Sequence, residues 1–261
     1  MAWCIVLALC GDMLLAQVPT APPKLATHVD PVFEVATIKP SRPEERLAML
    51  VKGHQFITIA SSLYDLITFA YGLHARQITD GPAWLETEKY DVTAQPGSEV
   101  QPNGQPLRVM IQKLLAERFR LTFHRDKKEL SVFTIAVGKA GIKIAQSSDP
   151  NGTPGVGFRG PGAMTVKSAT ISDFAGFMQG YVMDRPVVDQ THLAGKYDFR
   201  LNWTPNESQF EGRALFEPAQ QTGDGADLFT AIQEQLGLKL ESAKVPVEVL
   251  VIDRIEKPSE N

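Results

Sequence analysis

The sequence contains only two cysteines, Cys4 and Cys10, in 261 residues. Both lie in residues 2–16, a short apolar run followed by a polar, proline-rich segment. This arrangement is typical of a secretory signal peptide, with cleavage expected after Ala16, and the run is too short for a membrane span. A chain that begins at Gln17 has no thiol, which excludes thiol catalysis, cysteine-ligated zinc and disulfide bonds. Leu9 stands where a lipoprotein signal has a small residue, so lipidation at Cys10 is not expected.

An excess of positive charge is also lacking. The chain has 26 basic and 30 acidic residues, a formal net charge of −4, and no basic stripe. Because neutralising phosphates requires clustered lysine or arginine, nucleic acid is not an expected partner.

The familiar catalytic strings are missing as well. The chain has no G-x-S-x-G, no S-x-x-K and no G-x-x-x-x-G-K, and its five histidines show no metal-site spacing. The stretch 155–160, GVGFRG, matches a dinucleotide-binding pattern, but it follows a turn-rich segment and runs into Pro161. That pattern requires a preceding strand and a following helix, so we predict no cofactor and no metal.

Several secondary-structure elements can be predicted from local patterns. Ser62 followed by Asp65 forms a capping box, which predicts a helix that ends before Gly72. Pro106 is expected to open a second helix. Residues 119–137 are predicted to form a hairpin, and residues 147–162, rich in glycine and proline, a linker.

Elements of the first half return in the second half. Thr170 and Asp173 form another capping box, and the Lys-Tyr-Asp step at residues 89–91 returns at residues 196–198. The apolar positions of the helix and strand over residues 111–123 match those of residues 228–240 at a constant offset. We therefore predict an α+β fold built from two tandem copies of a small unit, with amphipathic helices packed on a mainly antiparallel sheet.

The predicted organisation has five parts. They are a signal peptide (1–16), a Pro-rich linker (17–32), a first α+β unit (33–146), a Gly/Pro linker (147–162) and a second α+β unit (163–261) with a polar insertion at 204–224.

Four residues are candidates for ligand binding. Asp80 lies in the Asp80-Gly81-Pro82 turn, Trp84 follows it, and Asp189 stands at the position of the second half that corresponds to Asp80. Trp203 lies beside the polar insertion, where it is either an exposed aromatic that binds a ligand or, as for most aromatics, part of the core. The pairs Asp80 with Asp189 and Asp91 with Asp198 are alternatives for acid–base catalysis. Turn, strand and capping roles account for most of these carboxylates, so no catalytic residue is assigned.

Five stretches of the chain resemble a family of conserved hypothetical proteins from soil Acidobacteria. They are FEVATIKPS (33–41), QITDGPAWLETEKYDVTA (77–94), LLAERFRLTFHRDKKELSVFTIAV (114–137), RPVVDQTHLAGKYDFRLNWTP (185–205) and LFTAIQEQLGLKLESAKVPVEVLVIDRIEKPSEN (228–261). The resemblance implies a secreted domain of unknown function, of which some members are attached to membrane metallopeptidase sensors of the BlaR1 and MecR1 type. It brings no catalytic residues with it.

Together these observations favour an exported protein, periplasmic or extracellular, that acts as a non-enzymatic binding or sensor module. Its partner would be an unknown ligand or extracytoplasmic protein, and no stable membrane span is expected after signal cleavage. A hydrolase that uses paired carboxylates or a histidine is the alternative. An enzyme requires at least two such groups within hydrogen-bond reach in one cleft.

Overall fold

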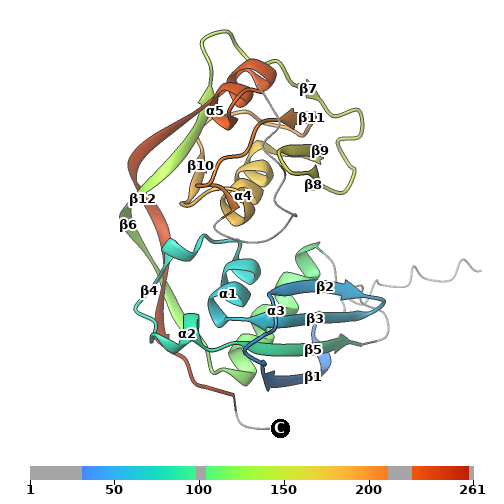
Figure 1. The fold of residues 1–261 in the computed structure, drawn as a ribbon, viewed down its shortest axis with the longest axis vertical. Helices are drawn as coiled ribbons and strands as arrows, with labels where there is room; N and C mark the ends of the chain where they lie inside the picture. The colour runs from blue at the N-terminus through green and yellow to red at the C-terminus, as the bar shows by residue number, and fades with distance from the viewer. Residues whose placement is uncertain (1–30, 98–103, 211–224, 259–261) are drawn as a thin grey trace, which may run out of the picture. The chain divides into compact units, whose positions relative to one another are not determined.

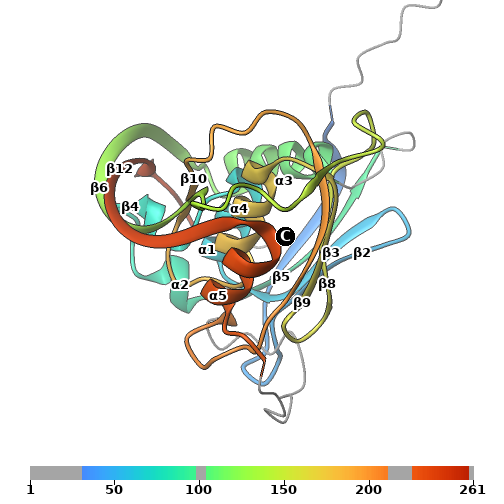
Figure 2. The same ribbon diagram turned by 90° about the horizontal axis from the view of Figure 1, so that it is seen from above.

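Two long strands from different halves of the chain form a central ladder. In the computed structural model, which describes residues 31–97, 104–210 and 225–258, β6 (Thr122–Val137) pairs antiparallel with β12 (Leu238–Arg254) along its whole length (Figure 1). The ladder is strongly curved (Figure 2), as is usual for two-stranded ribbons. The predicted signal peptide and all but two residues of the first linker lie outside the described residues.

The hairpin predicted for residues 119–137 is wrong. The polar run at residues 124–129 resembles a turn, but it continues β6 because β12 offers a complete row of partners to it. A hairpin needs a break in the strand, and none occurs here.

Two helices begin as their sequences predict. Helix α1 (Leu63–Tyr71) starts with the Ser62–Asp65 capping box and ends at Gly72, which has a left-handed backbone with φ 65°. Helix α4 (Ile171–Tyr181) starts with the Thr170–Asp173 capping box. In each box the hydroxyl accepts from the aspartate N–H, and the carboxylate accepts from the capping residue, which satisfies donors that the first helical turn leaves open.

The first half contains a four-stranded sheet, sheet A, in the order β1-β5-β3-β2. Its strands are β1 (Phe33–Pro40), β2 (Ala48–Lys52), β3 (Gln55–Ser61) and β5 (Tyr90–Pro96), all antiparallel. Helix α1 and helix α3 (Gly104–Arg118) contact each other and lie on one side of this sheet (Figure 2).

The second half contains another four-stranded antiparallel sheet, sheet C, in the order β7-β11-β9-β8. Its strands are β7 (Ala145–Gln146), β8 (Gly155–Gly160), β9 (Ala163–Ala169) and β11 (Tyr197–Asn202). The stretch predicted as a linker, 147–162, therefore contributes a strand. Its valine and phenylalanine, Val156 and Phe158, pack against the core, which a turn-based interpretation of the glycines overlooks.

Short elements flank the ladder in the third sheet, whose order is β10-β6-β12-β4. Strand β4 (Ile78–Thr79) runs parallel to the end of β12, and β10 (Val187–Asp189) runs parallel to the end of β6. The remaining described helices are short: η1 (Ala75–Gln77), α2 (Trp84–Thr87), α5 (Leu228–Ala231) and η3 (Ile232–Leu236), a π-helix.

The buried apolar residues form two clusters, one mainly in each half of the chain. Each cluster also contains residues from the end of a long strand that belongs to the other half. The first cluster holds the buried residues of α1 and α3 together with Leu250 and Ile252 of β12. The second holds the buried residues of α4 and η3 together with Phe133 and Ile135 of β6. Burial of these four side chains therefore stabilises each half through residues of the other.

The described residues thus form a mixed α and β structure in which most strand pairs are antiparallel. None of the described helices is both long enough and apolar enough to cross a membrane. The predicted insertion at 204–224 is described only as far as residue 210, because residues 211–224 lie outside the described part.

Candidate functional site

Asp80 lies exposed at the end of β4, with a positive φ of 62°. Its Oδ2 atom accepts from Thr79 Oγ1 at 3.0 Å and lies 3.5 Å from Lys128 Nζ. The Thr79 hydroxyl, and then the Lys128 ammonium, lower the pKa of the Asp80 carboxyl.

Asp189 is engaged in its own turn. Its Oδ1 atom accepts from the backbone N–H of Thr191 at 2.9 Å and from the Thr191 hydroxyl at 2.7 Å, a local arrangement that stabilises a turn. Asp189 lies opposite Ile135, whereas Thr79 lies opposite Val251. These positions are separated by roughly 35 Å measured along β12, so Asp80 and Asp189 do not form a carboxylate pair.

Trp84 is half-buried on α2 and holds the C-terminal segment. The Lys257 ammonium lies 5.8 Å from the centre of its ring and also pairs with Glu88. Glu88 in turn accepts from the Tyr90 hydroxyl at 2.8 Å. These contacts tie residue 257 to the first half of the chain.

Of the two alternatives for Trp203, the structure shows the buried one. Its side chain belongs to the second cluster and is only 6% exposed. The indole N–H donates to Gln209 Oε1 at 2.8 Å, and the ring stacks on Phe210. The residues after Trp203 fold back over it, so this side chain has no surface for a ligand.

Asp91 and Asp198 both accept hydrogen bonds from backbone N–H groups. Asp91 Oδ1 accepts from the N–H of Ala60 at 3.0 Å, and Asp198 Oδ1 accepts from the N–H of Ser168 at 2.7 Å. Ala60 and Ser168 both have left-handed backbones, with φ 51° and 45°, so each carboxylate supports a strained strand residue. The Ser168 N–H, and then the Ser147 hydroxyl, lower the pKa of the Asp198 carboxyl.

His124, a histidine to be considered for acid–base catalysis, has a carboxylate partner. Its Nδ1 atom lies 2.8 Å from Asp253 Oδ1, and both side chains are about half exposed. His124 also contributes to the lowered pKa of Asp80, so the structure brings Asp80 near His124. His124 lies on β6, and Asp80 follows β4 at the edge of the same sheet. His192 is exposed in the turn after Thr191, with φ 56°.

In the part of the chain that the structure describes, no group of three histidine, aspartate or glutamate side chains is arranged to hold a metal ion.

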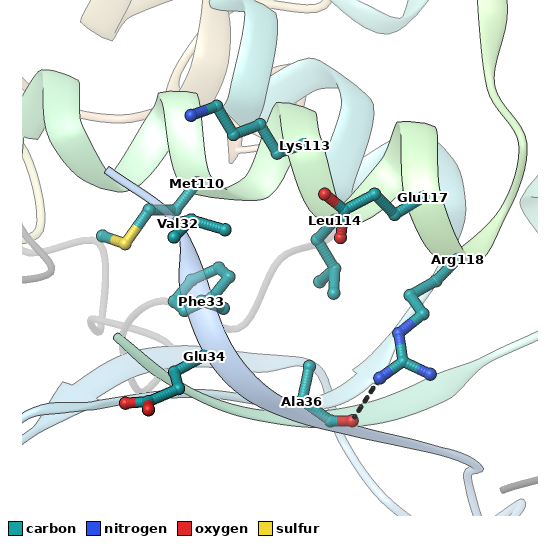
Figure 3. Close-up of a pocket in the computed structure, with 9 residues that line it drawn as sticks. All are labelled: Val32, Phe33, Glu34, Ala36, Met110, Lys113, Leu114, Glu117 and Arg118. Carbon is teal, nitrogen blue, oxygen red and sulfur yellow. Dashed lines mark hydrogen bonds between the residues drawn. The ribbon is translucent and has the colours of Figure 1, made fainter. Parts of the chain in front are cut away.

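One hollow lies between the edge strand β1 and helix α3 (Figure 3). Its volume is about 100 Å³, and Lys113 and Glu117 of the helix are among its lining residues. Arg118 Nη2 donates to the carbonyl oxygen of Ala36 at 3.4 Å. This hydrogen bond joins α3 to β1 and occupies an edge group of the sheet, so the hollow is a seam between packed elements.

A second hollow, of about 200 Å³, lies on the face of sheet C that points away from the core. We call this surface the outer face of sheet C. Thr165 of β9 pairs with Gly157 of β8 on one side and with Arg200 of β11 on the other, so all three share this face. The lining residues are Arg159, Ala163, Met164, Thr165, Arg200 and Asn202.

The lining of this hollow contains two guanidinium groups and no carboxylate. Arg159 Nε donates to Thr165 Oγ1 at 3.2 Å. The Arg200 guanidinium has no hydrogen bond or ion pair with any residue in the described ranges. A cation in this position is available to a ligand.

Sequence reasoning missed both arginines. Arg159 falls in the stretch interpreted as a linker. Arg200 could have been found from alternation, because its neighbours Phe199 and Leu201 are apolar. Along a strand, period-2 alternation places Arg200 on the opposite face.

A protein-family model described as "Protein of unknown function (DUF3738)" matches residues 64–255, which is more than half of the chain. No curated protein matches the chain significantly. No solved structure does so either.

Proposed function

The chain belongs to the DUF3738 family of proteins of unknown function, and we propose that it is a non-enzymatic binding module whose ligand contacts the outer face of sheet C. One observation carries the proposal: Arg200 presents a guanidinium without a partner among the described residues, beside a hollow of about 200 Å³. A charged group held at a concave surface without a counter-charge is typical of a recognition site.

The geometry of the other charged groups also supports binding over catalysis. A general acid or base must come within hydrogen-bond reach of the reacting atoms and of its supporting groups. Asp91, Asp189 and Asp198 each accept from a backbone N–H. These carboxylates are engaged in holding the backbone.

Export and a sensor-type role are part of the proposal. The apolar run at residues 2–16 and the absence of cysteine after Cys10 support export to the periplasm or the medium. The resemblance to acidobacterial proteins, some attached to sensors of the BlaR1 and MecR1 type, supports a role in extracytoplasmic sensing. Fractionation of a bacterial host, with the mass of the exported chain, tests the cleavage after Ala16.

We also infer that the two halves are copies of one unit, with helices packed on a mainly antiparallel sheet. Three correspondences support this inference: the paired capping boxes, the paired left-handed residues held by an aspartate, and the parallel strands β4 and β10 at opposite ends of the ladder. In an experimental structure, residues 54–137 should superpose on residues 163–256 with the same element order and direction. Disagreement in either would contradict the inference.

A hydrolase remains the second candidate because of one contact, the 2.8 Å pair of His124 and Asp253. A carboxylate that orients a histidine is the arrangement used to activate a nucleophile. If this pair is catalytic, the His124→Ala variant loses a turnover that the wild type shows.

The experiment that tests the proposed function is a thermal-shift screen of residues 17–261 against peptidoglycan fragments, peptides, glycans and divalent metals, with product analysis of each mixture. We expect a ligand that raises the melting temperature and is recovered unchanged. Turnover of that ligand, abolished by His124→Ala, would replace the proposal with the hydrolase.

A further inference from the structure

We propose that the hollow on the outer face of sheet C is an oxyanion site, which binds a phosphate or carboxylate group between Arg159 and Arg200. This inference rests on the proposed function and names the chemical class of its ligand.

Every polar side chain of the lining can donate a hydrogen bond. Arginine offers a planar fork of N–H groups that matches carboxylate and phosphate oxygens. Thr165 Oγ1 accepts from Arg159 Nε, which leaves the hydroxyl proton free to donate into the hollow.

The fourth polar side chain is that of Asn202, whose backbone is bonded to the side chain of Gln235. The Asn202 N–H donates to Gln235 Oε1 at 3.0 Å, and its carbonyl oxygen accepts from Gln235 Nε2 at 2.6 Å. These bonds use only the main-chain atoms of Asn202, so its side-chain amide is available to donate to a ligand.

Space for the anion arises because the middle of the face has small residues. Ala163 is small, and Gly157, opposite Thr165, has no side chain. A Cβ atom added at Gly157 would meet no atom within 4 Å. The surface between the two arginines therefore has room for an anion.

The charge of this face selects an anion over a cation. Besides Arg159 and Arg200, the outward residues include Lys167, and the one carboxylate on these strands, Asp198, accepts from the Ser168 N–H. The face therefore carries a positive excess although the whole chain has a net charge of −4. Such a local field concentrates anions at the surface.

The test is a ¹H–¹⁵N NMR titration of residues 17–261 with sodium phosphate, sodium acetate and sodium chloride, at constant ionic strength. We expect phosphate or acetate to shift the amide signals of residues 157–165 and 198–202 in a saturable way, whereas chloride does not. The Arg159→Gln and Arg200→Gln variants should each weaken this binding at least tenfold. Arg46→Gln, which removes an exposed arginine of the first half, should leave the affinity unchanged.

The conservative variant separates charge from geometry. Arg200→Lys keeps the charge and loses the fork, so its affinity should fall between those of the wild type and Arg200→Gln. The spectrum of each variant also reports whether it is folded. Equal shifts with chloride, or equal weakening by Arg46→Gln, would overturn the oxyanion site.

Two further titrations distinguish the source of the anion. Glucose 6-phosphate presents a phosphate monoester, and a peptide of four glutamates presents clustered carboxylates. Saturable shifts at the same residues with either probe support the site and identify the source. If none of the anions binds while another compound of the screen stabilises the protein, this inference fails and the proposed function stands.

Discussion

The end of β12 contributes buried residues to the first cluster, and this predicts how much stability the Leu250 side chain provides. This side chain lies in β12, is 1% exposed, and belongs to the first cluster, which also contains the buried residues of helices α1 and α3. Truncation of a buried leucine to alanine removes its transfer free energy and leaves a cavity, which together cost about 2 to 5 kcal/mol. We therefore expect Leu250→Ala to lower the free energy of unfolding by that amount.

The region that loses stability in the variant tests whether the end of β12 packs in the first cluster. Leu240, on the same strand, is also buried but belongs to the second cluster, so Leu240→Ala is the matched control. Hydrogen exchange read by mass spectrometry should show that Leu250→Ala loosens α1 and α3 first, and that Leu240→Ala loosens α4 and η3 first.

Urea denaturation of the two variants supplies the magnitude. A cost below about 1 kcal/mol for Leu250→Ala would contradict this prediction. The prediction is equally refuted if that variant loosens α4 while α1 keeps its protection, because Leu250 would then not belong to the first cluster in solution.

Three further predictions concern the caps, a carboxylate that accepts from a strained strand residue, and a buried tryptophan. Ser62→Ala and Thr170→Ala each remove an N-cap and should cost about 1 kcal/mol, or 2 to 4 °C in thermal melts, with ligand binding retained. Unchanged melting with lost binding would place these residues in a site. The pKa of Asp198 is lowered on folding, so the ionised carboxylate stabilises the fold at neutral pH, and this effect is lost as the pH falls from about 4 through the folded pKa. The Asp198→Asn variant should therefore lose less stability than the wild type between pH 7 and pH 3. An equal loss in both proteins would contradict this prediction. Trp203→Phe leaves the buried Gln209 amide without its partner. It should lower the free energy of unfolding by about 1 to 3 kcal/mol in urea denaturation and leave ligand binding unchanged. Unchanged stability with weakened ligand binding would make Trp203 a ligand contact.

Much of the local structure could be predicted from the sequence because it depends on residues close in the chain. The Ser62–Asp65 and Thr170–Asp173 boxes place the first turns of α1 and α4 without help from the rest of the fold. Strand β6 shows the limit. Its polar middle is extended only because β12, more than a hundred residues later, pairs with it, and a local pattern contains no information about that partner.

The candidate site could be predicted only in part for the same reason. Asp80 lies in the turn region that its sequence predicts, but its partner Lys128 comes from β6. Asp189 is bonded to Thr191 close by, and Trp84 contacts Lys257 of the C-terminal segment. The hollow between Arg159 and Arg200 depends on three strands brought together by sheet C. Spacing along the chain does not reveal a juxtaposition of this kind.

The most direct test of the binding proposal takes the ligand that gives the largest thermal shift and measures its affinity and its conversion together. Isothermal titration should be compared for the wild type and an Arg159→Gln, Arg200→Gln double variant, while mass spectrometry follows the ligand over the same period. The account predicts binding by the wild type, loss of binding in the double variant, and recovery of the ligand unchanged from both. Conversion of the ligand by the wild type, with full activity in the double variant and none in His124→Ala, would contradict it.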